Sequence, residues 1–490
     1  MFTQIPVNLN MRLKRYCFVF FMLWGLISQL NGQSLDQVFR EFKNNHGLKN
    51  AAIGFCLMDA KKGTVLFSYH DSETLVPASC LKIPTTAAGL GLLGRDHKYV
   101  TSITCDFISA SHDTVKGDLT CIGGGDPTFG SSHVNDQQIS DIVAKIAKAG
   151  IVRITGKLVI DDSYFDTMHI CTHWAWDDIG NYFGAGVFSL NYGENDYRIM
   201  VQPGKKPGDT VRYLNVFPKV GLTFENRLRT GAVNSGDQSN VFGLCEDDCR
   251  VLAGTIPPGN GPFSIKGSVP NPPAQFAKEL AVKLYQRKIL KDSNNWTVAS
   301  HPTATHHNLL SIDSVVSPAL SDIVHTTNLE SNNLYAEAIL KEIGKKYTGK
   351  GSREAGRAVV KAYWKNAGLD TTGIYMEDGC GLSRNDRISA FQLAKMLSII
   401  QGKPYYDDFL QSLPVSGYSG AMKHICAGKD TKGKIHCKTG HMDKVRAYSG
   451  YVQTQSGKWL CFSLIVNDYD MSAAEIRQEI EKVLEALVKA

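Results

Sequence analysis

The 490-residue sequence lacks several features that mark common classes of protein. It has no run of lysine and arginine and no alternation of basic with aromatic residues, so nothing in it favours nucleic-acid binding. It also has no Cys-x-x-Cys pair and no His-Glu-x-x-His, the usual zinc signatures. His169 and His173 have helical spacing, but no further ligands follow them. We therefore expect no metal and no other cofactor.

The N-terminus contains an apolar run that is shorter than the about 20 residues of a membrane-spanning helix. Residues 16–27 are apolar, follow Arg12, Lys14 and Arg15, and precede a polar stretch. This order is typical of a signal peptide, which we predict over residues 1–32; the alternative is an uncleaved anchor. Cleavage would lower the formal net charge from +6 to +3, because the segment carries three basic and no acidic residues. We expect an exported protein with at most peripheral membrane association.

Twelve cysteines are present, and one of them lies in the predicted signal peptide. The remaining odd number leaves at least one free thiol. Cys245 and Cys249 flank three acidic residues in a polar loop, where a local disulfide and two free thiols are both open readings. The other cysteines have apolar neighbours and are expected to be small buried side chains.

A chain of this length should form several domains. A predicted hairpin over residues 51–69 is followed by a helix from near Ser79 to about Leu93, which has almost no polar face and should be buried. Short strands then dominate residues 101–267. Helical periodicity returns later, and three strands and a last helix close the chain. We expect one catalytic domain built from residues 34–98 and 290–490, and mainly β domains inserted over residues 99–289.

Three short motifs occur in an order typical of serine penicillin-recognising enzymes. They are Ser79-Cys80-Leu81-Lys82, Ser331-Asn332-Asn333 and Lys438-Thr439-Gly440. Each is common by chance when taken alone, and Ser79 alone would be read as a helix N-cap. Their combination is informative because the first opens a buried helix, the second precedes another helix, and the third ends a strand.

The motifs supply the groups that a serine nucleophile needs. The hydroxyl of Ser79 requires a base, and the helical spacing places the amine of Lys82 beside it. A lysine acts as a base only when its pKa is lowered, and burial near a second cation, Lys438, would lower it. Ser331 can relay a proton, and the amide of Asn333 can hold a substrate carbonyl.

The third motif is expected to bind the substrate. Lys438 and Thr439 would bind a terminal carboxylate, and Gly440 would let the substrate backbone lie against the strand edge.

Further segments make the sequence resemble the class C low-molecular-mass penicillin-binding proteins, the D-alanyl-D-alanine carboxypeptidase and endopeptidase family. The similarity covers nearly the whole mature chain. The segments are Pro77–Lys82, Gly117–Leu119 with Gly123–Thr128, Gly156–Asp162, Asp378–Arg384 and Ser412–Val415. The 252-residue gap between Ser79 and Ser331 also fits, because this family carries extra domains there.

The resemblance implies an α+β fold with a transpeptidase and β-lactamase-like core, in which helices flank an antiparallel sheet. It implies an oxyanion hole made by the backbone N–H groups of Ser79 and His441. It also implies that Asp161 and Arg384 reach into the cleft and contact the side chain of the stem peptide. From the residues alone, a turn carboxylate for Asp161 and a surface ion pair for Arg384 are equally open.

The expected function is that of a periplasmic serine D-Ala-D-Ala carboxypeptidase or DD-endopeptidase, which acts on peptidoglycan stem peptides and is acylated by β-lactam antibiotics. Two rivals are a serine β-lactamase and a non-catalytic peptidoglycan or penicillin sensor. The first lacks support because no Glu-x-x-x-N element follows the nucleophile helix, and the second because both lysines are intact. Departures from the family pattern are Asn332 for Asp, Cys380 for Ser, and the large His441 and Arg446, which leave side-chain preference and drug affinity open.

Overall fold

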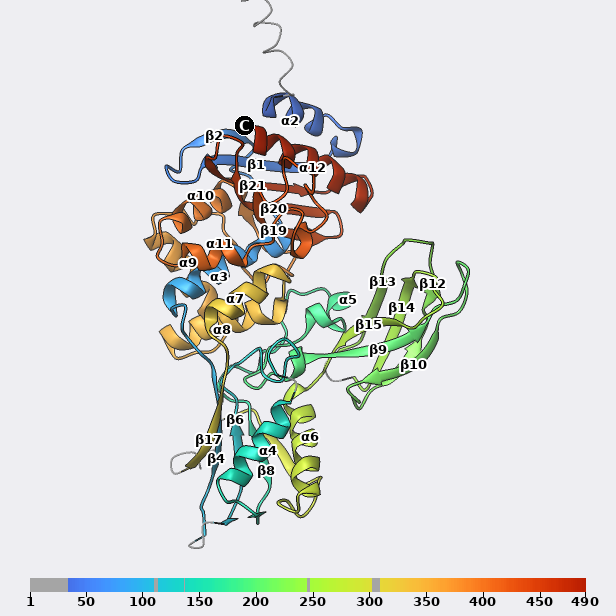
Figure 1. Ribbon diagram of the computed structural model, residues 1–490, viewed down its shortest axis with the longest axis vertical. Coiled ribbons are helices and arrows are strands. Elements are labelled where there is room, and N and C mark those ends of the chain that lie inside the picture. Colours follow the sequence, from blue (N-terminus) through green and yellow to red (C-terminus); the bar gives the residue numbers. More distant parts are fainter. Residues whose placement is uncertain (1–33, 110–112, 136, 245–246, 302–308) are drawn as a thin grey trace, which may run out of the picture.

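The structure is a computed structural model that describes residues 34–490 except 110–112, 136, 245–246 and 302–308. The predicted signal peptide and Cys245 therefore lie outside the described residues. Among the helices of the described part, none is both long and apolar enough to cross a membrane. The molecule is elongated, with a helix-rich upper part, a lower part built around a second sheet, and a β unit that projects to one side (Figure 1).

A five-stranded antiparallel sheet forms the centre of the upper part, with the order β19-β20-β21-β1-β2. Its strands are β1 (Ala52–Asp59), β2 (Val65–Tyr69), β19 (Ile435–Met442), β20 (Val445–Gln453) and β21 (Trp459–Asn467). The two ends of the chain thus meet in one sheet, as we expected, and β19 lies at its edge. This arrangement confirms the predicted α+β core.

Both faces of this sheet are covered by helices, which explains why β1 is buried along nearly its whole length. Successive side chains of a strand point to opposite faces. Phe55 and Leu57 accordingly pack with α2 (Leu35–Lys43) and α12 (Ala473–Lys489), whereas Cys56 belongs to a core shared with the helices of the other face. Those helices are α3 (Lys82–Leu92), α7 (Leu320–Leu329), α8 (Asn333–Thr348), α9 (Arg353–Asn366), α10 (Ala390–Gln401) and α11 (Tyr406–Ser412).

The lower part contains a second five-stranded sheet, in the order β16-β8-β6-β4-β17. Its strands are β4 (Val100–Cys105), β6 (Leu119–Ile122), β8 (Leu158–Asp161), β16 (Trp296–Ala299) and β17 (Leu310–Val316), and α4 (Gln138–Lys148) and α6 (Pro272–Gln286) share its core. Because β16 and β17 pair with β8 and β4, they belong to the inserted sheet, although we had assigned them to the catalytic domain. The expected return at residue 290 is therefore too early, and on this pairing we propose a boundary near residue 317.

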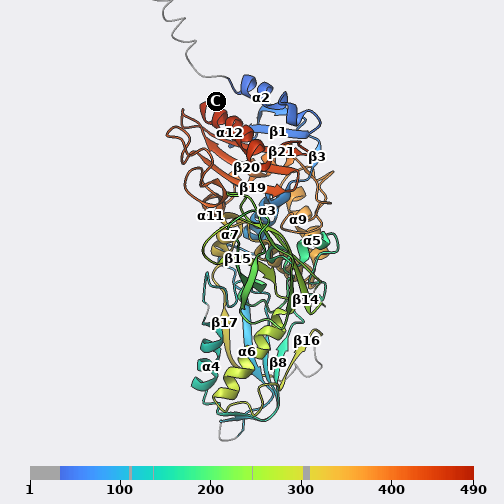
Figure 2. The ribbon, with the colours of Figure 1, turned by 90° about the vertical axis from the view of Figure 1, so that its right-hand side faces the viewer.

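The projecting unit consists of two small sheets around one apolar core. Its strands are β9 (Asp196–Gln202), β10 (Arg212–Phe217), β11 (Thr223–Asn226), β12 (Arg229–Thr230), β13 (Gln238–Phe242), β14 (Cys249–Ile256) and β15 (Phe263–Ser268). Turning the molecule by 90° brings this unit in front of the junction between the upper and lower parts (Figure 2). The segment between β8 and β9 leads back to the catalytic helices before it enters this unit. Its Asp166 contacts Lys341 of α8, and its Trp174 contacts Asp378.

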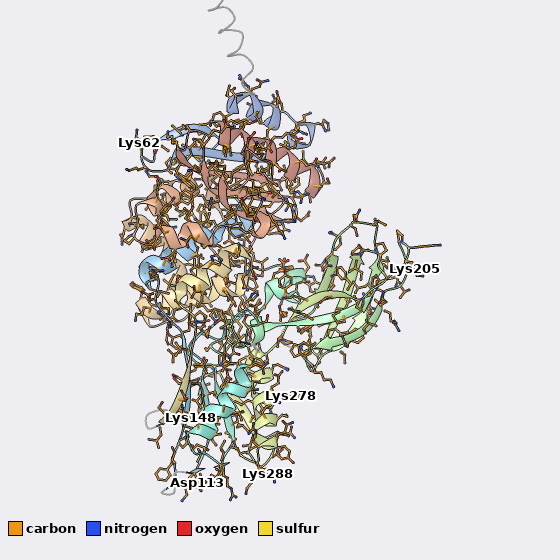
Figure 3. The ribbon with its side chains drawn as sticks, viewed as in Figure 1. Lys62, Asp113, Lys148, Lys205, Lys278 and Lys288 are labelled. Atoms are coloured by element: carbon orange, nitrogen blue, oxygen red, sulfur yellow. The ribbon has the colours of Figure 1, made fainter. Side chains whose placement is uncertain are left out.

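Most lysines point outward, as Lys62, Lys205 and Lys288 do at the edges of the molecule (Figure 3). In the part of the chain that the structure describes, Lys82, Lys341 and Lys438 are instead fully buried. Burial of a charged amine is costly unless polar partners compensate for the lost hydration. Each of these three lysines must therefore be held by specific polar contacts.

Candidate active site

Ser79 lies in a 3₁₀ turn, Ala78–Leu81, that precedes α3. We had expected the helix itself to start near Ser79. The preceding residue, Ala78, has a φ of 46°, in the left-handed region that non-glycine residues rarely adopt. Lys82 is the first residue of α3, and its Nζ lies 3.1 Å from the Ser79 Oγ. The turn thus keeps the hydroxyl half-buried at the surface of the cleft while the amine sits beneath it.

The amine of Lys82 contacts three acceptors and no solvent. Besides the Ser79 hydroxyl, it donates to the Asn333 Oδ1 at 2.6 Å and to the Cys380 carbonyl at 2.7 Å. Burial lowers the pKa of Lys82, although the nearby thiol of Cys380 and carboxylates of Asp378 and Glu337 oppose that shift. A lysine with a lowered pKa beside a hydroxyl can take its proton, which is the task that the sequence assigned to Lys82.

Ser331 and Asn332 connect α7 to α8, and the first of them has a φ of 60°. Asn332 caps α8, because its side chain accepts a hydrogen bond from the backbone N–H of Tyr335 at 3.1 Å. Asparagine and aspartate cap helices about equally well, so the departure from the usual Asp at this position leaves the helix start intact. Asn333 then faces the site from the first turn of α8.

Lys438 reaches the same cleft from β19. Its Nζ donates to the Ser331 Oγ at 2.9 Å and to the Thr439 carbonyl at 2.8 Å. Burial, and then the neighbouring Lys82, lowers the pKa of Lys438 to about 7. The structure thus brings together Ser79, Lys82, Ser331, Asn333 and Lys438, which are more than 350 residues apart at the extremes of the sequence.

The free edge of β19 borders the cleft. The N–H of Cys437 points away from β20, because it donates to the Pro414 carbonyl. Backbone direction repeats every second residue of a strand, so the N–H groups of Thr439 and His441 point the same way, toward the cleft. This direction fits the oxyanion-hole position expected for His441.

Close packing requires glycine at position 440, a constraint that the sequence alone did not indicate. A Cβ on it would lie 2.4 Å from the Pro77 carbonyl and 3.1 Å from the Cβ of Ala78. Only glycine therefore lets β19 approach the nucleophile turn so closely.

A cavity of about 590 Å³ opens above these groups, within the size range of ordinary ligand sites. Ser79, Ser331, Asn333 and His441 line it. Its remaining charged side chains are mostly acidic: Asp177, Asp178, Glu194, Asp196, Glu330 and Asp443 outnumber Lys266 and Arg384. The cavity is therefore suited to a substrate that carries a cationic group.

Asp161 does not reach this cavity, contrary to our expectation. It lies at the end of β8, is 3% exposed, and accepts a hydrogen bond from the backbone N–H of Ser163. Arg384 does line the cavity, and its guanidinium donates to the Asp443 carbonyl at 3.4 Å. The acidic group near Arg384 is instead Asp178. Burial and, next, the charge of Asp177 raise the pKa of Asp178 to about 6, and the charge of Arg384 opposes this shift. Asp177 and Asp178 belong to the short helix α5 (Trp176–Ile179). The sequence analysis did not identify either residue as part of the site.

The model of the D-Ala-D-Ala carboxypeptidase 3 (S13) family matches residues 35–487, almost the entire described chain. The chain belongs to this family. The match includes the two halves of the catalytic domain and everything inserted between them.

A curated relative and two solved structures match this chain over most of its length. A D-alanyl-D-alanine carboxypeptidase of Actinomadura sp. (strain R39) is 28% identical over 441 residues, which cover 86% of this chain and 79% of that protein. The fold is shared with penicillin binding protein 4 of Haemophilus influenzae, with a TM-score of 0.78 at 19% identity, over 94% of this chain and 100% of that one. It is also shared with a predatory endopeptidase of Bdellovibrio bacteriovorus, with a TM-score of 0.50 at 16% identity, over 90% and 93% of the two chains.

Two thiols adjoin the S13 site in sequence, and both face the core. Cys80 and Cys437 are fully buried. Burial raises the pKa of Cys80 to about 11 and raises that of Cys437 well above its usual value, so neither is a ready nucleophile. We expect iodoacetamide to leave both unmodified in the folded protein, while the exposed Cys249 reacts. Peptide mapping by mass spectrometry checks this, and rapid modification of Cys80 together with loss of penicillin labelling would show that a thiol lines the cleft.

Proposed function

We propose that the chain is a serine D-alanyl-D-alanine carboxypeptidase that also acts as a DD-endopeptidase. It cleaves peptidoglycan stem peptides through an acyl-enzyme on Ser79. The observation that carries the proposal is the pair of buried lysines, each within hydrogen-bond distance of a hydroxyl: Lys82 with Ser79, and Lys438 with Ser331. This arrangement fits serine acyl transfer in a chain of the S13 family.

Acylation begins when the Ser79 hydroxyl attacks the carbonyl carbon of the penultimate D-Ala. Lys82 takes the hydroxyl proton, and the backbone N–H groups of Ser79 and His441 stabilise the oxyanion. The C–N bond then breaks. The proton that Lys82 took passes through Ser331, which lies next to Lys438, to the departing amine, and Lys82 becomes neutral again. The products of this half are free D-Ala, or a cross-bridge amine, and an ester on Ser79.

Deacylation uses water in place of the amine. Lys82, again neutral, takes a proton from the water as it attacks the ester, and the collapse of the second tetrahedral intermediate returns that proton to Ser79. The carboxylate product leaves, and the site regains its starting state.

The cationic partners are matched to the terminal carboxylate of the substrate. Lys438 and Thr439 lie together on β19, and Arg384 lines the cavity nearby. A sensor that binds peptidoglycan without turnover would need no buried base, and a β-lactamase would need a further group to speed hydrolysis of the penicilloyl ester. The intact Lys82 environment favours the peptidase over a sensor, and the match to the S13 family over residues 35–487 favours it over a β-lactamase.

Location and inhibitors are further parts of the proposal. The basic, apolar and polar order of residues 1–32 supports export to the periplasm, where peptidoglycan lies. Penicillin binding protein 4 of Haemophilus influenzae has been solved in complex with a β-lactam. We propose that β-lactams acylate this chain at Ser79 in the same cavity.

The experiment that tests the function uses purified muropeptides. The protein is incubated with uncross-linked pentapeptides and with cross-linked dimers, and the products are identified by mass. Loss of one alanine from the monomer indicates carboxypeptidase activity, and conversion of the dimer into monomers indicates endopeptidase activity. The proposal is wrong if neither substrate changes with enzyme that a fluorescent penicillin labels fully.

The carboxylate of Asp178 is expected to select substrates with a free side-chain amine. The change Asp178→Asn should lower kcat/KM for such a stem peptide by about tenfold, the effect of losing one hydrogen bond to a charged group. The same peptide with its amine acetylated should be affected little. Asp161→Asn is the matched control, because Asp161 lies outside the cavity. Equal losses with both peptides would contradict a contact between Asp178 and the amine.

A further inference from the structure

The carbonyl of Cys380, one of the three partners of the Lys82 amine, belongs to a tightly held loop over residues 378–383. Two glycines let this loop pack closely. A Cβ on Gly381 would lie 2.0 Å from the Ala78 carbonyl, and one on Gly379 would lie 3.0 Å from the Cβ of Leu340. The loop is therefore wedged between the nucleophile turn and α8, so its conformation sets where the Cys380 carbonyl points.

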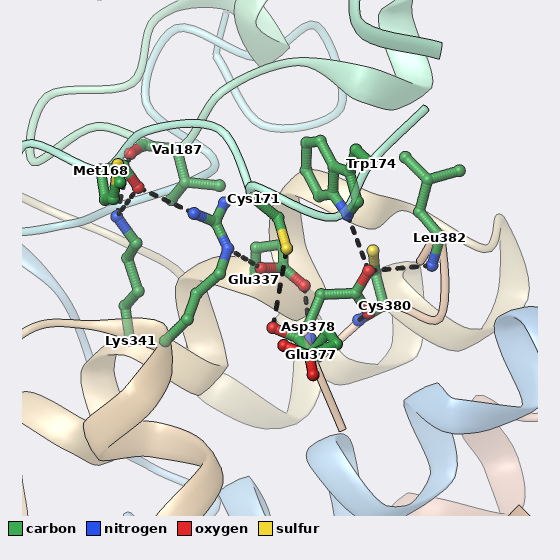
Figure 4. Close-up of polar contacts among 12 residues, drawn as sticks. Met168, Cys171, Trp174, Val187, Glu337, Lys341, Glu377, Asp378, Cys380 and Leu382 are labelled. Carbon is green, nitrogen blue, oxygen red and sulfur yellow. Dashed lines mark hydrogen bonds and ion pairs between the residues drawn. The ribbon is translucent and has the colours of Figure 1, made fainter. Parts of the chain in front are cut away.

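A single carboxylate organises this loop. Asp378 is fully buried and accepts five hydrogen bonds. Four come from backbone N–H groups of the loop itself, those of Cys380, Gly381, Leu382 and Ser383. The fifth comes from the indole Nε1 of Trp174, at 2.7 Å, from the inserted region (Figure 4).

A second buried carboxylate supports the first from α8. Glu337 accepts from the backbone N–H of Gly379 and pairs with Arg353. The guanidinium of Arg353 in turn donates to the carbonyls of Met168 and His169 and lies over the ring of Trp174, with 5.2 Å to its centroid. The same segment is fixed by Lys341, which donates to the Met168 carbonyl (Figure 4).

These carboxylates are not arranged as a metal site. The oxygens of Asp378 and Glu337 and the Cys380 thiol lie close together, but the carboxylate oxygens already accept hydrogen bonds from N–H donors. Glu337 is neutralised by Arg353, whereas no lysine or arginine of the described chain forms an ion pair with Asp378. N–H donors therefore hold the Asp378 carboxylate. The buried carboxyl of Asp386 also faces it, and burial together with the Asp378 charge raises the pKa of Asp386 well above its usual value. The charge of Asp378 also acts on Lys82, whose protonated form it favours.

We propose that Asp378 is a positioning residue for the general base: its carboxylate, held by the Trp174 indole of the inserted region, fixes the Cys380 carbonyl against the Lys82 amine. The inference rests on the proposed function of Lys82 as the base. It makes the inserted region part of the catalytic machinery rather than only a substrate-binding attachment.

The proposal predicts an effect on the pH dependence of acylation. The titratable groups that face the Lys82 amine are Asp378 and Cys380 from the loop, Glu337 from α8, Cys80 from its own turn and Lys438 from β19. Asp378 and the Cys380 carbonyl both favour the protonated amine, so loss of either lowers the pKa of Lys82. Since the base must be neutral, the acid limb of the acylation rate should then move to lower pH.

The test measures acylation by a chromogenic β-lactam from pH 4 to 9, per penicillin-titratable site, for the wild type and three variants. We expect Asp378→Asn to lower the maximum rate at least about tenfold and to move the acid limb down by about half a pH unit or more. Trp174→Phe removes one N–H donor and should give a smaller change in the same direction. Trp176→Phe is the matched control; it lies two residues further on, is largely exposed and should behave as the wild type.

Each outcome decides the inference separately from the function. If the wild type is not acylated at all, the proposed function fails. If the wild type is acylated but the pH profiles of both variants superimpose on its own after correction for active sites, the residues only stabilise the fold and the inference is overturned. If Asp378→Asn does not fold, Trp174→Phe decides the question by itself.

Discussion

Replacing Ser79 by alanine should abolish covalent labelling by a fluorescent penicillin and lower DD-peptidase activity by roughly 10⁴-fold or more. The hydroxyl is the only atom that forms the ester, and Lys82 has no other hydroxyl among its hydrogen-bond partners. The fold should survive, because Ser79 is half-buried and its side chain leaves the turn at the cleft surface.

The measurement is in-gel fluorescence after incubation with the penicillin, together with a thermal melting curve. Ser68→Ala is a suitable control, since Ser68 is an exposed serine on β2 of the same domain. Labelling that persists in Ser79→Ala with an unchanged melting temperature would remove the nucleophile from this account.

Lys82→Arg should be as damaging as Lys82→Ala, with acylation reduced about 10²-fold or more, the usual cost of losing a general base. Arginine keeps the positive charge but does not give up its proton in proteins. Its larger head group also has no room among the three acceptors that enclose the Lys82 amine.

Stopped-flow acylation with a chromogenic β-lactam separates the two possible bases. Near-normal acylation in Lys82→Arg would contradict the assignment and direct attention to Lys438 acting through Ser331, which are 2.9 Å apart. Lys438→Arg is the companion variant, because it tests whether that second lysine must also lose a proton.

Much of the catalytic centre could be predicted from the sequence, because its chemistry depends on short motifs with local geometry. The three-residue spacing of Ser79 and Lys82 brings the two groups together whether the chain forms a 3₁₀ turn or a regular helix. The sequence pattern and the family resemblance also placed both ends of the mature chain in one domain, in which β1 and β19–β21 share a sheet. The boundary of the inserted region was harder, since β17 returns to pair with β4 across about two hundred residues.

What the sequence could not supply were contacts between segments with no shared periodicity. Asp161 and Asp178 are both acidic residues near a turn, and only the path of the chain after β8 decides which one faces the cavity. The bond from Trp174 to Asp378 joins residues 204 apart, and nothing local in either segment indicates it. Such contacts depend on how the inserted region packs on the catalytic helices, which is a property of the whole fold.

The most direct test of the central claim is to find where the acyl group sits. The protein is incubated with penicillin, digested under mildly acidic conditions, and mapped by mass spectrometry, with a D-Ala-D-Ala-terminated peptide as competitor. We predict one penicilloyl group per molecule, on the peptide that contains Ser79, and slower labelling when the competitor is present. An adduct on any other residue, or no adduct in folded protein, would contradict the claim that Ser79 is the nucleophile.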